Sequence, residues 1–583
     1  MQFAVEYFNK IILSYYENTN HKCCPECIKR RLLNTRKDRK HLSQYKFEQR
    51  NEKEVMFNKL VFNIMEELKT EEKLVDEFDR RKVVVVDKNT MEISTNYINP
   101  VPDCPNCAEY VSDTEEETIK DFKTLLENLN SGEVLPFRSG SLADLKTNIE
   151  KIFLNKDFGI ITTLLDNYEC GPFPIAIAML PLENGMDEPG TGRTCEIENS
   201  RAVALLEAVE RYAGFYPKGK KTVVYDTYNH LMDLNKEVID IHELIINAES
   251  ISNTSQYKNE KFFFNADEKY HWVYGYNLTN QTPVLVPETL AYYGMILKDE
   301  SYKKELFTYE ISNGCSVGAS LLEASYYGLL EDIERDAFLT SWYTDRDIIK
   351  LILNEEFWMS DSKLKSEIEI FENYYSDYRL DIYEISADIN IPVVMMTVTK
   401  KVPEKEKMNF MCATAADATV FKAAEKAMHE ISSIFVGLQE KFGDNYTDIK
   451  EKAENLKLVK DMSDHSLVFG YYKSLEKIHF HEQAVREIVI TEYENESKVD
   501  DICSQYRYLI EECDRLDKKI IVVNQTTEEM KKIDLYCTKT LVPGLLPMTF
   551  GSDNIRISDK RIREMEKLNN RKLNVRFEPH PFP

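Results

Sequence analysis

The chain has 583 residues, several times the length of an average domain, so we expect roughly two to four domains and an ample core. Its 100 acidic residues outnumber 74 basic ones, and the net charge of −26 opposes nucleic-acid binding and favours small molecules or basic peptides as partners. No run of about 18 apolar residues occurs, which predicts a cytoplasmic protein without a membrane span or signal peptide.

Residues 1–130 are predicted to form a small N-terminal module. They contain clustered cysteines, a basic helical segment at 29–50 and a strand-like segment at 81–93. A polar helix within 111–134 then ends at Gly132, a residue type that commonly closes helices. We place the junction with the second region, 131–583, at this point.

The second region alternates apolar strands with amphipathic helices. The predicted strands are 173–182, 262–278, 282–288, 391–399 and 519–526. Helices are predicted near 200–213, 321–339 and 418–437. The fold class expected from this alternation is mixed α+β, with a catalytic body attached to the small module.

Two CPxC sequences in the first module suggest a metal site. Cys24 and Cys27 form one pair and Cys104 and Cys107 the other, and two thiolate pairs suit a structural zinc ion with a filled coordination shell. Redox CxxC pairs and unrelated reduced cysteines are the alternatives, and Cys23 is ambiguous. The remaining cysteines are expected to be buried apolar fillers: Cys170, Cys195, Cys315, Cys412, Cys503, Cys513 and Cys537.

The sequence LLExxER occurs twice in the second region. Residues three and four apart share a helix face, so each copy groups two carboxylates with an arginine. The first copy contains Glu207, Glu210 and Arg211, and the second contains Glu331, Glu334 and Arg335. Glu323 is expected on the same stripe as the second copy. A solvated acidic face would explain one copy, whereas two copies together predict a site for hard cations and a polyphosphate.

A glycine-rich turn precedes each of these helices, at 188–200 and 312–325. Glycine there permits either close approach to a phosphate or a tight entry into the helix. Arg193 is the cation of the first turn. No GxxxxGK[ST] phosphate loop occurs anywhere in the chain.

The chain closes on EPHPFP, with prolines at 579, 581 and 583. Proline fixes φ and removes a backbone donor, so this segment is predicted to be a stiff extended rod. Either it is a plain proline-rich tail, or it docks beside the catalytic centre with little entropy left to lose. In the second case we expect its loss to lower turnover and to leave the melting temperature nearly unchanged.

The ordered set GTGRT, LLEAVER, LLEDIERDAF, VPGLLPMTFG and PxPxP resembles the YcaO superfamily, specifically its azoline-forming cyclodehydratases of ribosomal peptide (bacteriocin-type) biosynthesis. The resemblance covers roughly 130–583 and implies an ATP-binding body. The implied ATP-binding residues are Glu207, Glu210, Arg211, Glu323, Glu331, Glu334 and Arg335. Arg193, the cation of the first glycine-rich turn, is a further candidate for binding the nucleotide. The implied Mg2+ ligands among them are Glu207, Glu210, Glu331 and Glu334.

The N-terminal module resembles a truncated ubiquitin-activating-enzyme-like domain with its zinc site. This resemblance implies a precursor peptide as substrate and a separate leader-peptide-binding protein of the ubiquitin-activating-enzyme type. A flavin dehydrogenase acting afterwards and a homodimeric assembly are further expectations.

The reaction implied is ATP-dependent conversion of Cys, Ser or Thr residues of the peptide to thiazolines or oxazolines. His580 and Pro583 in the tail are the candidate catalytic residues, and His429 is another candidate base. Thioamide or amidine formation on a peptide is an alternative activity. An inactive zinc scaffold that recruits peptide to a partner enzyme is the alternative of another class.

Overall fold

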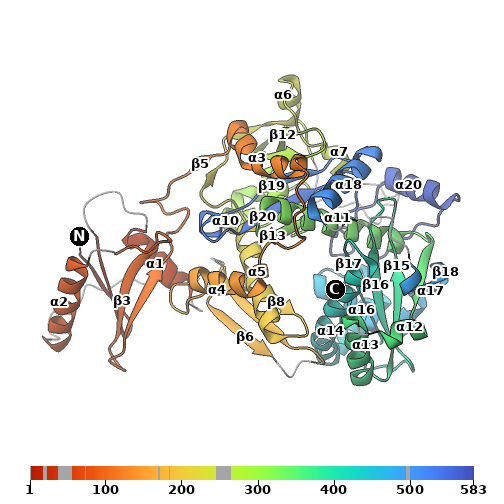
Figure 1. The fold of residues 1–583 in the computed structure, drawn as a ribbon, viewed down its shortest axis with the longest axis horizontal. Coiled ribbons are helices and arrows are strands. Elements are labelled where there is room, and N and C mark those ends of the chain that lie inside the picture. Colours follow the sequence, from red (N-terminus) through yellow and green to blue (C-terminus); the bar gives the residue numbers. More distant parts are fainter. Residues whose placement is uncertain are drawn as a thin grey trace.

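The computed structural model describes residues 2–16, 23–36, 55–71, 74–167, 171–182, 184–244, 264–360, 362–493, 499 and 501–583. The molecule is elongated, with the N-terminal module at one end and a much larger body at the other (Figure 1). Among the described residues, no helix combines the length and the apolar character that a bilayer crossing requires.

The N-terminal module is built on an antiparallel sheet of order β1-β2-β3-β4, namely Gln2–Tyr7, Lys10–Tyr15, Arg81–Asp87 and Ile93–Ile98. Helices α1 (Pro25–Asn34) and α2 (Val55–Thr70) accompany it. Alternate residues of a strand face opposite sides, and here Val83 and Val85 belong to one small core while Val84 and Val86 belong to another. Two covered faces explain why this strand is a continuous apolar run.

Helix α3 (Glu115–Ser131) ends at Gly132, whose φ of 72° is the left-handed conformation expected of a helix-closing glycine. Its buried residues Phe122, Leu125 and Leu129 belong to the main core of the body. By packing, α3 is therefore part of the body, although it precedes the predicted junction. The division at residue 131 stays a prediction.

A second, three-stranded antiparallel sheet joins β6 (Thr163–Asn167), β7 (Ile175–Pro181) and β8 (Asp187–Arg193). Helices α4 (Leu142–Phe153) and α5 (Ile197–Gly214) share a core with this sheet, and α5 packs on β7 and β8. A short parallel pair joins β5 (Val111–Ser112) to β9 (Lys220–Lys221), which follows α5 in the chain.

The six-stranded sheet has the order β10-β11-β19-β20-β13, with β12 also paired to β11. Its strands are Val224–Thr227, Lys269–Asn277, Thr282–Pro287, Cys315–Gly318, Ile521–Asn524 and Tyr536–Leu541, numbered β10, β11, β12, β13, β19 and β20. Strand β13 leads directly into the long helix α11 (Leu321–Tyr343), which packs on β13 and β20. The glycine-rich segment that contains β13 and leads into α11 therefore places this helix directly against the sheet.

A five-stranded sheet of order β17-β16-β15-β14-β18 completes the body. Its strands are β14 Ile348–Ile352, β15 Tyr378–Glu384, β16 Val393–Lys400, β17 Phe410–Ala416 and β18 Ala484–Val489. Helix α14 (Val420–Asp444) covers β16 and β17, and α13 (Lys363–Tyr374) packs beside α14. The other longer helices of the body are α15 Tyr446–Glu454, α16 Met462–Gly470, α18 Ile502–Arg515 and α20 Asp559–Asn569.

Short helical segments connect these layers. They are α6 Tyr228–Asp233, α7 Ile241–Leu244, α9 Glu288–Ala291, α10 Met295–Lys298, α12 Glu355–Met359, α17 Phe480–Gln483 and α19 Glu528–Lys531, with 3-10 turns Glu300–Lys304, Leu456–Leu458, Tyr472–Lys477 and Ile490–Glu492. The mixed α+β class is confirmed, as are all three predicted body helices. Residues 37–50 of the basic segment, residues 262–263 of a predicted strand and Cys170 lie outside the described residues.

Candidate active site

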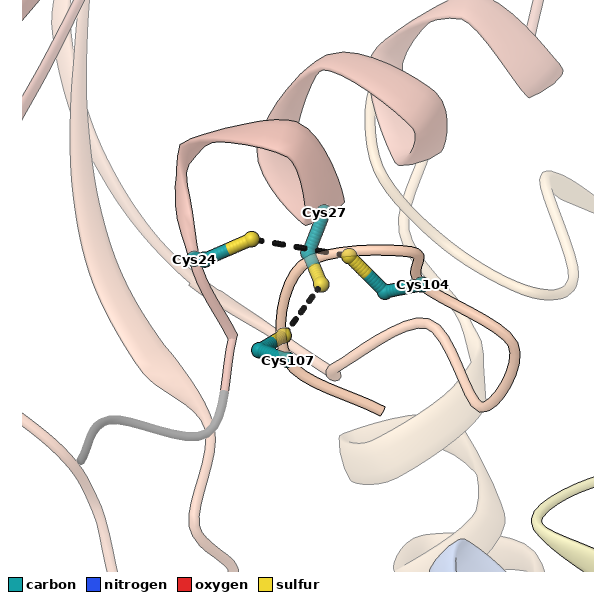
Figure 2. Close-up of side chains that lie close together, drawn as sticks. All are labelled: Cys24, Cys27, Cys104 and Cys107. Carbon is teal, nitrogen blue, oxygen red and sulfur yellow. Dashed lines mark hydrogen bonds between the residues drawn. The ribbon is translucent and has the colours of Figure 1, made fainter. Parts of the chain in front are cut away.

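Four cysteine thiols meet between the start of α1 and the loop that follows β4 (Figure 2). The Sγ atoms of Cys24 and Cys104 are 3.5 Å apart, and those of Cys27 and Cys107 are 3.4 Å apart. All four sulfurs lie within 4.8 Å of one another. Tetrahedral zinc–sulfur bonds of about 2.3 Å place neighbouring sulfurs roughly 3.8 Å apart, so this four-cysteine cluster fits one zinc ion.

The CPxC sequence explains the local geometry. Cys24 caps α1, Pro25 begins the helix, and the Cys27 amide donates to the Cys24 carbonyl at 2.9 Å. The Val101 amide donates to Cys27 Sγ at 3.3 Å. The closest sulfur contacts join the two CPxC sequences and not the two cysteines within one, which favours a shared ion over a redox pair.

The first LLExxER copy lies on α5. Glu207 and Arg211 form an ion pair of 2.6 Å, one helical turn apart. Glu207 Oε2 also accepts the Thr191 backbone N–H at 2.6 Å, and Arg211 reaches Glu188 at 3.0 Å. The side chains of this copy therefore bond to strand β8 as well as to each other.

The second copy lies on α11. Arg335 is 3.4 Å from Glu331 and 3.7 Å from Glu334, and Glu334 accepts the Thr414 hydroxyl of β17 at 2.7 Å. The side chains of Glu331 and Glu334 are only 26% and 14% exposed. This copy is held by its intrahelical pairs and by a strand of a different sheet.

The carboxylates of the two copies come together between α5 and α11. Burial, and then the negative charge of Glu331, raise the pKa of Glu210 well above its usual value. Burial likewise raises the pKa of Glu331, and that of Glu334 to about 7. Carboxylates that repel one another in a half-buried site are what a hard divalent cation neutralises. We name the group Glu207, Glu210, Glu331 and Glu334 the acidic cluster.

A buried lysine beside the acidic cluster was missed at the level of sequence. Lys539 on β20 is fully buried, and its Nζ donates to Glu310 and to the Ile311 carbonyl, both at 3.0 Å. Its charge opposes the rise in the pKa values of Glu210 and Glu331. A lone lysine inside the otherwise uncharged strand YCTKTL was the available signal.

The two glycine-rich turns serve close packing. A Cβ atom at Gly192 would lie 1.6 Å from the Ser200 carbonyl oxygen, and a Cβ at Gly318 would lie 2.7 Å from the Ala324 amide nitrogen. The first turn thus lets β8 lie directly on α5, and the second lets the chain enter α11 tightly. Of the two predicted uses of these glycines, the geometry supports the tight helix entry.

Arg193 and Glu323 occupy different surroundings. Arg193 pairs with Glu430 of α14 at 2.9 Å, and the Glu430 charge also raises the pKa of Arg335, which places Arg193 at the border of the acidic cluster. Glu323, whose side chain is 3% exposed, accepts Arg138 at 2.8 Å and the Ser139 amide at 3.1 Å. Its carboxylate is therefore engaged by the segment that precedes α4.

The proline-rich tail packs into the body and reaches Arg335. Residues 579–582 are buried, and the Phe582 ring lies 4.5 Å from the Arg335 guanidinium carbon and 5.0 Å from the Phe338 ring. The Trp342 indole N–H donates to the Glu578 carbonyl at 3.0 Å. Because removal of this tail would expose apolar surface, a fall in melting temperature is now expected in place of an unchanged one.

His580 is fully enclosed beside a second histidine. Its Nε2 bonds the Thr549 carbonyl at 2.9 Å, while its own carbonyl accepts from His465 Nδ1 at 2.8 Å. Burial lowers the pKa of His465 to about 4 and that of His580 well below its usual value, so both rings are neutral at pH 7. His580 Nδ1 has no hydrogen-bond partner among the described residues. Pro583 is partly exposed.

These features define an α+β protein with two candidate metal centres, one of thiolates and one of carboxylates. One solved structure, a heterocyclase in complex with substrate and cofactor, matches 100% of this chain and 77% of its own, with a TM-score of 0.71 and 18% identity. The structure of the heterocyclase TruD matches 99% and 74%, with a TM-score of 0.61 and 18% identity. These likenesses show a shared fold.

The E. coli microcin synthetase McbBCD complex with pro-MccB17 bound matches 72% of this chain and 96% of its own, with a TM-score of 0.48 and 15% identity. No curated protein matches this chain. The model of the family described as YcaO cyclodehydratase, ATP- and Mg2+-binding, matches residues 191–546. The chain therefore belongs to this family of ATP-dependent enzymes, and the resemblance drawn from its motifs is confirmed.

Proposed function

We propose that this protein converts Cys, Ser or Thr residues of a ribosomally made precursor peptide to thiazolines or oxazolines at the expense of ATP. Family membership supports the use of ATP and Mg2+. The observation that carries the proposal is the meeting of the two LLExxER helices in one acidic cluster, with the tail docked on Arg335 of the second helix.

The proposed reaction has three steps. The side-chain sulfur or oxygen of the peptide attacks the preceding amide carbonyl while its own proton passes to a base, and the amide oxygen becomes an oxyanion. That oxygen takes the γ-phosphoryl group of ATP, which releases ADP. Loss of the proton from the amide nitrogen and of the phosphate from carbon then forms the C=N bond of the ring and frees inorganic phosphate.

The protein contributes position and charge to this sequence. Glu207, Glu210, Glu331 and Glu334 would hold Mg2+, which when bound screens the phosphate charges. Arg335 and Arg211 are the cations at the rim of the cluster, and Arg193 borders it. Fixed cations of this kind stabilise the charge that moves onto phosphate oxygens. Glu323 is proposed to bind the nucleotide only on rearrangement of its Arg138 pair.

For proton transfer we propose the tail residues His580 and Pro583. The support is their place: Phe582 between them contacts Arg335, and His580 Nδ1 has no hydrogen-bond partner among the described residues. Because the ring is enclosed, it would need a small displacement of the tail to reach solvent or substrate.

The N-terminal module is proposed to be held by zinc at the four-cysteine cluster and to face a leader-peptide-binding partner protein. The support is the ion's position, since it would join α1 to a loop 80 residues further along the chain. A metal ion that joins distant segments stabilises the folded module when it is bound, and it takes no part in the chemical step.

The test is to incubate the purified protein with precursor peptide, the leader-binding protein, ATP and Mg2+, and to weigh the peptide. The expected result is loss of one water for each ring, with one ADP formed per ring. Glu334→Gln should abolish both, whereas Glu198→Gln, an exposed glutamate on α5, is the matched control and should retain both.

Other outcomes decide between the alternatives. Replacement of an amide oxygen by sulfur, seen only with added sulfide, would assign thioamide formation. A peptide of unchanged mass, together with no ADP release and no affinity for Mg-ATP, would assign the inactive scaffold.

A further inference from the structure

Three chemically different ligand atoms meet at a place outside both sites described above. Cys195 Sγ lies 2.9 Å from Glu367 Oε1 and 3.7 Å from His429 Nε2, and the last two atoms are 2.9 Å apart. All three atoms lie within 4.8 Å of one another. Cys195 was expected to be a buried apolar filler; it does pack against the main core, but it is only partly buried and its thiol is hydrogen-bonded.

The three residues come from three distant parts of the chain. Cys195 follows β8 and the GTGRT turn, Glu367 lies on α13, and His429 lies on α14. The neighbours of two of them form an ion pair, Arg193 with Glu430. Sequence reasoning could find no spacing signal here, because 172 residues separate Cys195 from Glu367 and 62 more separate Glu367 from His429.

The carboxylate at the centre is only partly satisfied. Glu367 is 2% exposed, and its Oε2 has no hydrogen-bond partner among the described residues. Its other oxygen bears the contacts with Cys195 and His429 and lies 3.5 Å from Lys363, whose side chain is 57% exposed. A buried carboxylate with a bare oxygen costs free energy unless a cation or donor approaches it.

We propose that Cys195, Glu367 and His429 form a binding site for a divalent transition-metal ion of the zinc class. One sulfur, one imidazole nitrogen and one carboxylate oxygen are ligands such ions take together, and a tetrahedral ion would hold them roughly 3.3–3.6 Å apart. The two separations of 2.9 Å would widen by roughly 0.4–0.7 Å, and the one of 3.7 Å would shorten slightly. Three protein ligands leave the fourth position to water or to an exogenous ligand.

An ion at this site would fix the turn after β8 to α13 and α14. The same turn carries Arg193, and β8 before it donates the Thr191 amide to Glu207. A bound ion would therefore restrict the motion of the turn that leads into α5, without contacting the acidic cluster. None of its three residues belongs to the acidic cluster or to the four-cysteine cluster, so the proposal does not rest on the proposed reaction. His429, a candidate base by sequence, is instead assigned here as a metal ligand.

The test counts zinc in the full-length protein after equilibrium dialysis at micromolar free Zn2+. Two ions per chain are expected in the wild type, and one in Cys195→Ser, Glu367→Gln and His429→Gln. Exposed His479, which pairs with Glu482 at 2.7 Å, supplies the control His479→Gln, which should keep two. With Co2+ in place of zinc, Cys195→Ser should remove part of the sulfur-to-cobalt absorption and leave that of the four-cysteine cluster.

Protection of the turn supplies a second measurement. Amide hydrogen exchange in the segment 187–197 is expected to slow on addition of Zn2+ to the wild type and to be unaffected by Zn2+ in His429→Gln. A zinc count that is the same in the wild type and in all three variants would overturn the proposal and leave these side chains as an ordinary hydrogen-bond network. Folding of each variant is checked by its circular dichroism.

Discussion

The two LLExxER helices have the same local sequence and very different surroundings. Half of the residues of α5 are buried, whereas more than three quarters of those of α11 are. On α5 the arginine pairs with Glu207 and with Glu188 of the adjacent strand; on α11 it pairs with Glu331 and stacks on Phe582 of the tail. The motif determines which residues share one face of each helix. The different elements packed against that face give the two arginines different partners.

The carboxylates at the centre of the comparison should show the largest effect. Glu210→Ala and Glu331→Ala are each expected to lower ATP turnover at least about 100-fold, because either change removes a cation ligand. The melting temperature without Mg2+ should stay the same or rise, since repulsion is relieved. Steady-state ADP release and thermal unfolding measure the two quantities. Normal turnover in both variants would contradict the assignment of the acidic cluster.

The two arginines should differ from each other. Arg335→Lys is expected to lower kcat about 10- to 100-fold, because lysine cannot both pair with Glu331 and stack on Phe582. Arg211→Lys should cost only a few-fold, since a lysine can still reach Glu207 from the same helix face. The measurements are kcat and KM for ATP in both variants. Equal losses of kcat would contradict the larger role expected for Arg335.

The tail contact should give a smaller effect. Phe582→Leu keeps a buried apolar side chain and removes the stack on Arg335, so we expect a loss of stability of about 1 kcal/mol and a drop in turnover below tenfold. Chemical denaturation and ADP release are the measurements. In the background of Arg335→Lys, the same change should cost less than in the wild type, and simple additivity would count against the contact.

The last effect concerns pH and is seen in stability, not in turnover. Burial raises the pKa of Glu334 from 4.5 to about 7, so its contribution to stability is complete below pH 4.5 and is lost as the pH rises toward 7. The metal-free protein should therefore lose stability over this interval, by at most roughly 3.4 kcal/mol from this group. Glu334→Gln should flatten the decline, and Mg2+ should do the same for the wild type. Denaturation midpoints at several pH values check this, and parallel curves for both proteins would refute it.

Local sequence was sufficient for several features because their physics is local. The CPxC spacing predicted the cysteine pairs, since a proline at the start of α1 fixes where the two thiols of one pair lie. Period and glycine placement predicted α3, α5, α11 and α14, because the apolar face and the cap of a helix are written within a few residues. The glycine-led entry to α11 was of the same kind.

Only the tertiary structure decided the rest, because it joins residues that no spacing rule relates. It placed Lys539 of β20 beside carboxylates of α5 and α11, and it joined Cys195 to two helices far along the chain. It also enclosed His580 and laid Phe582 on Arg335, where the sequence predicted a stiff rod and left its docking open. The stiffness follows from proline dihedrals, but the docking place depends on the packing of α11 and α16 around the tail, which is a property of the folded chain as a whole.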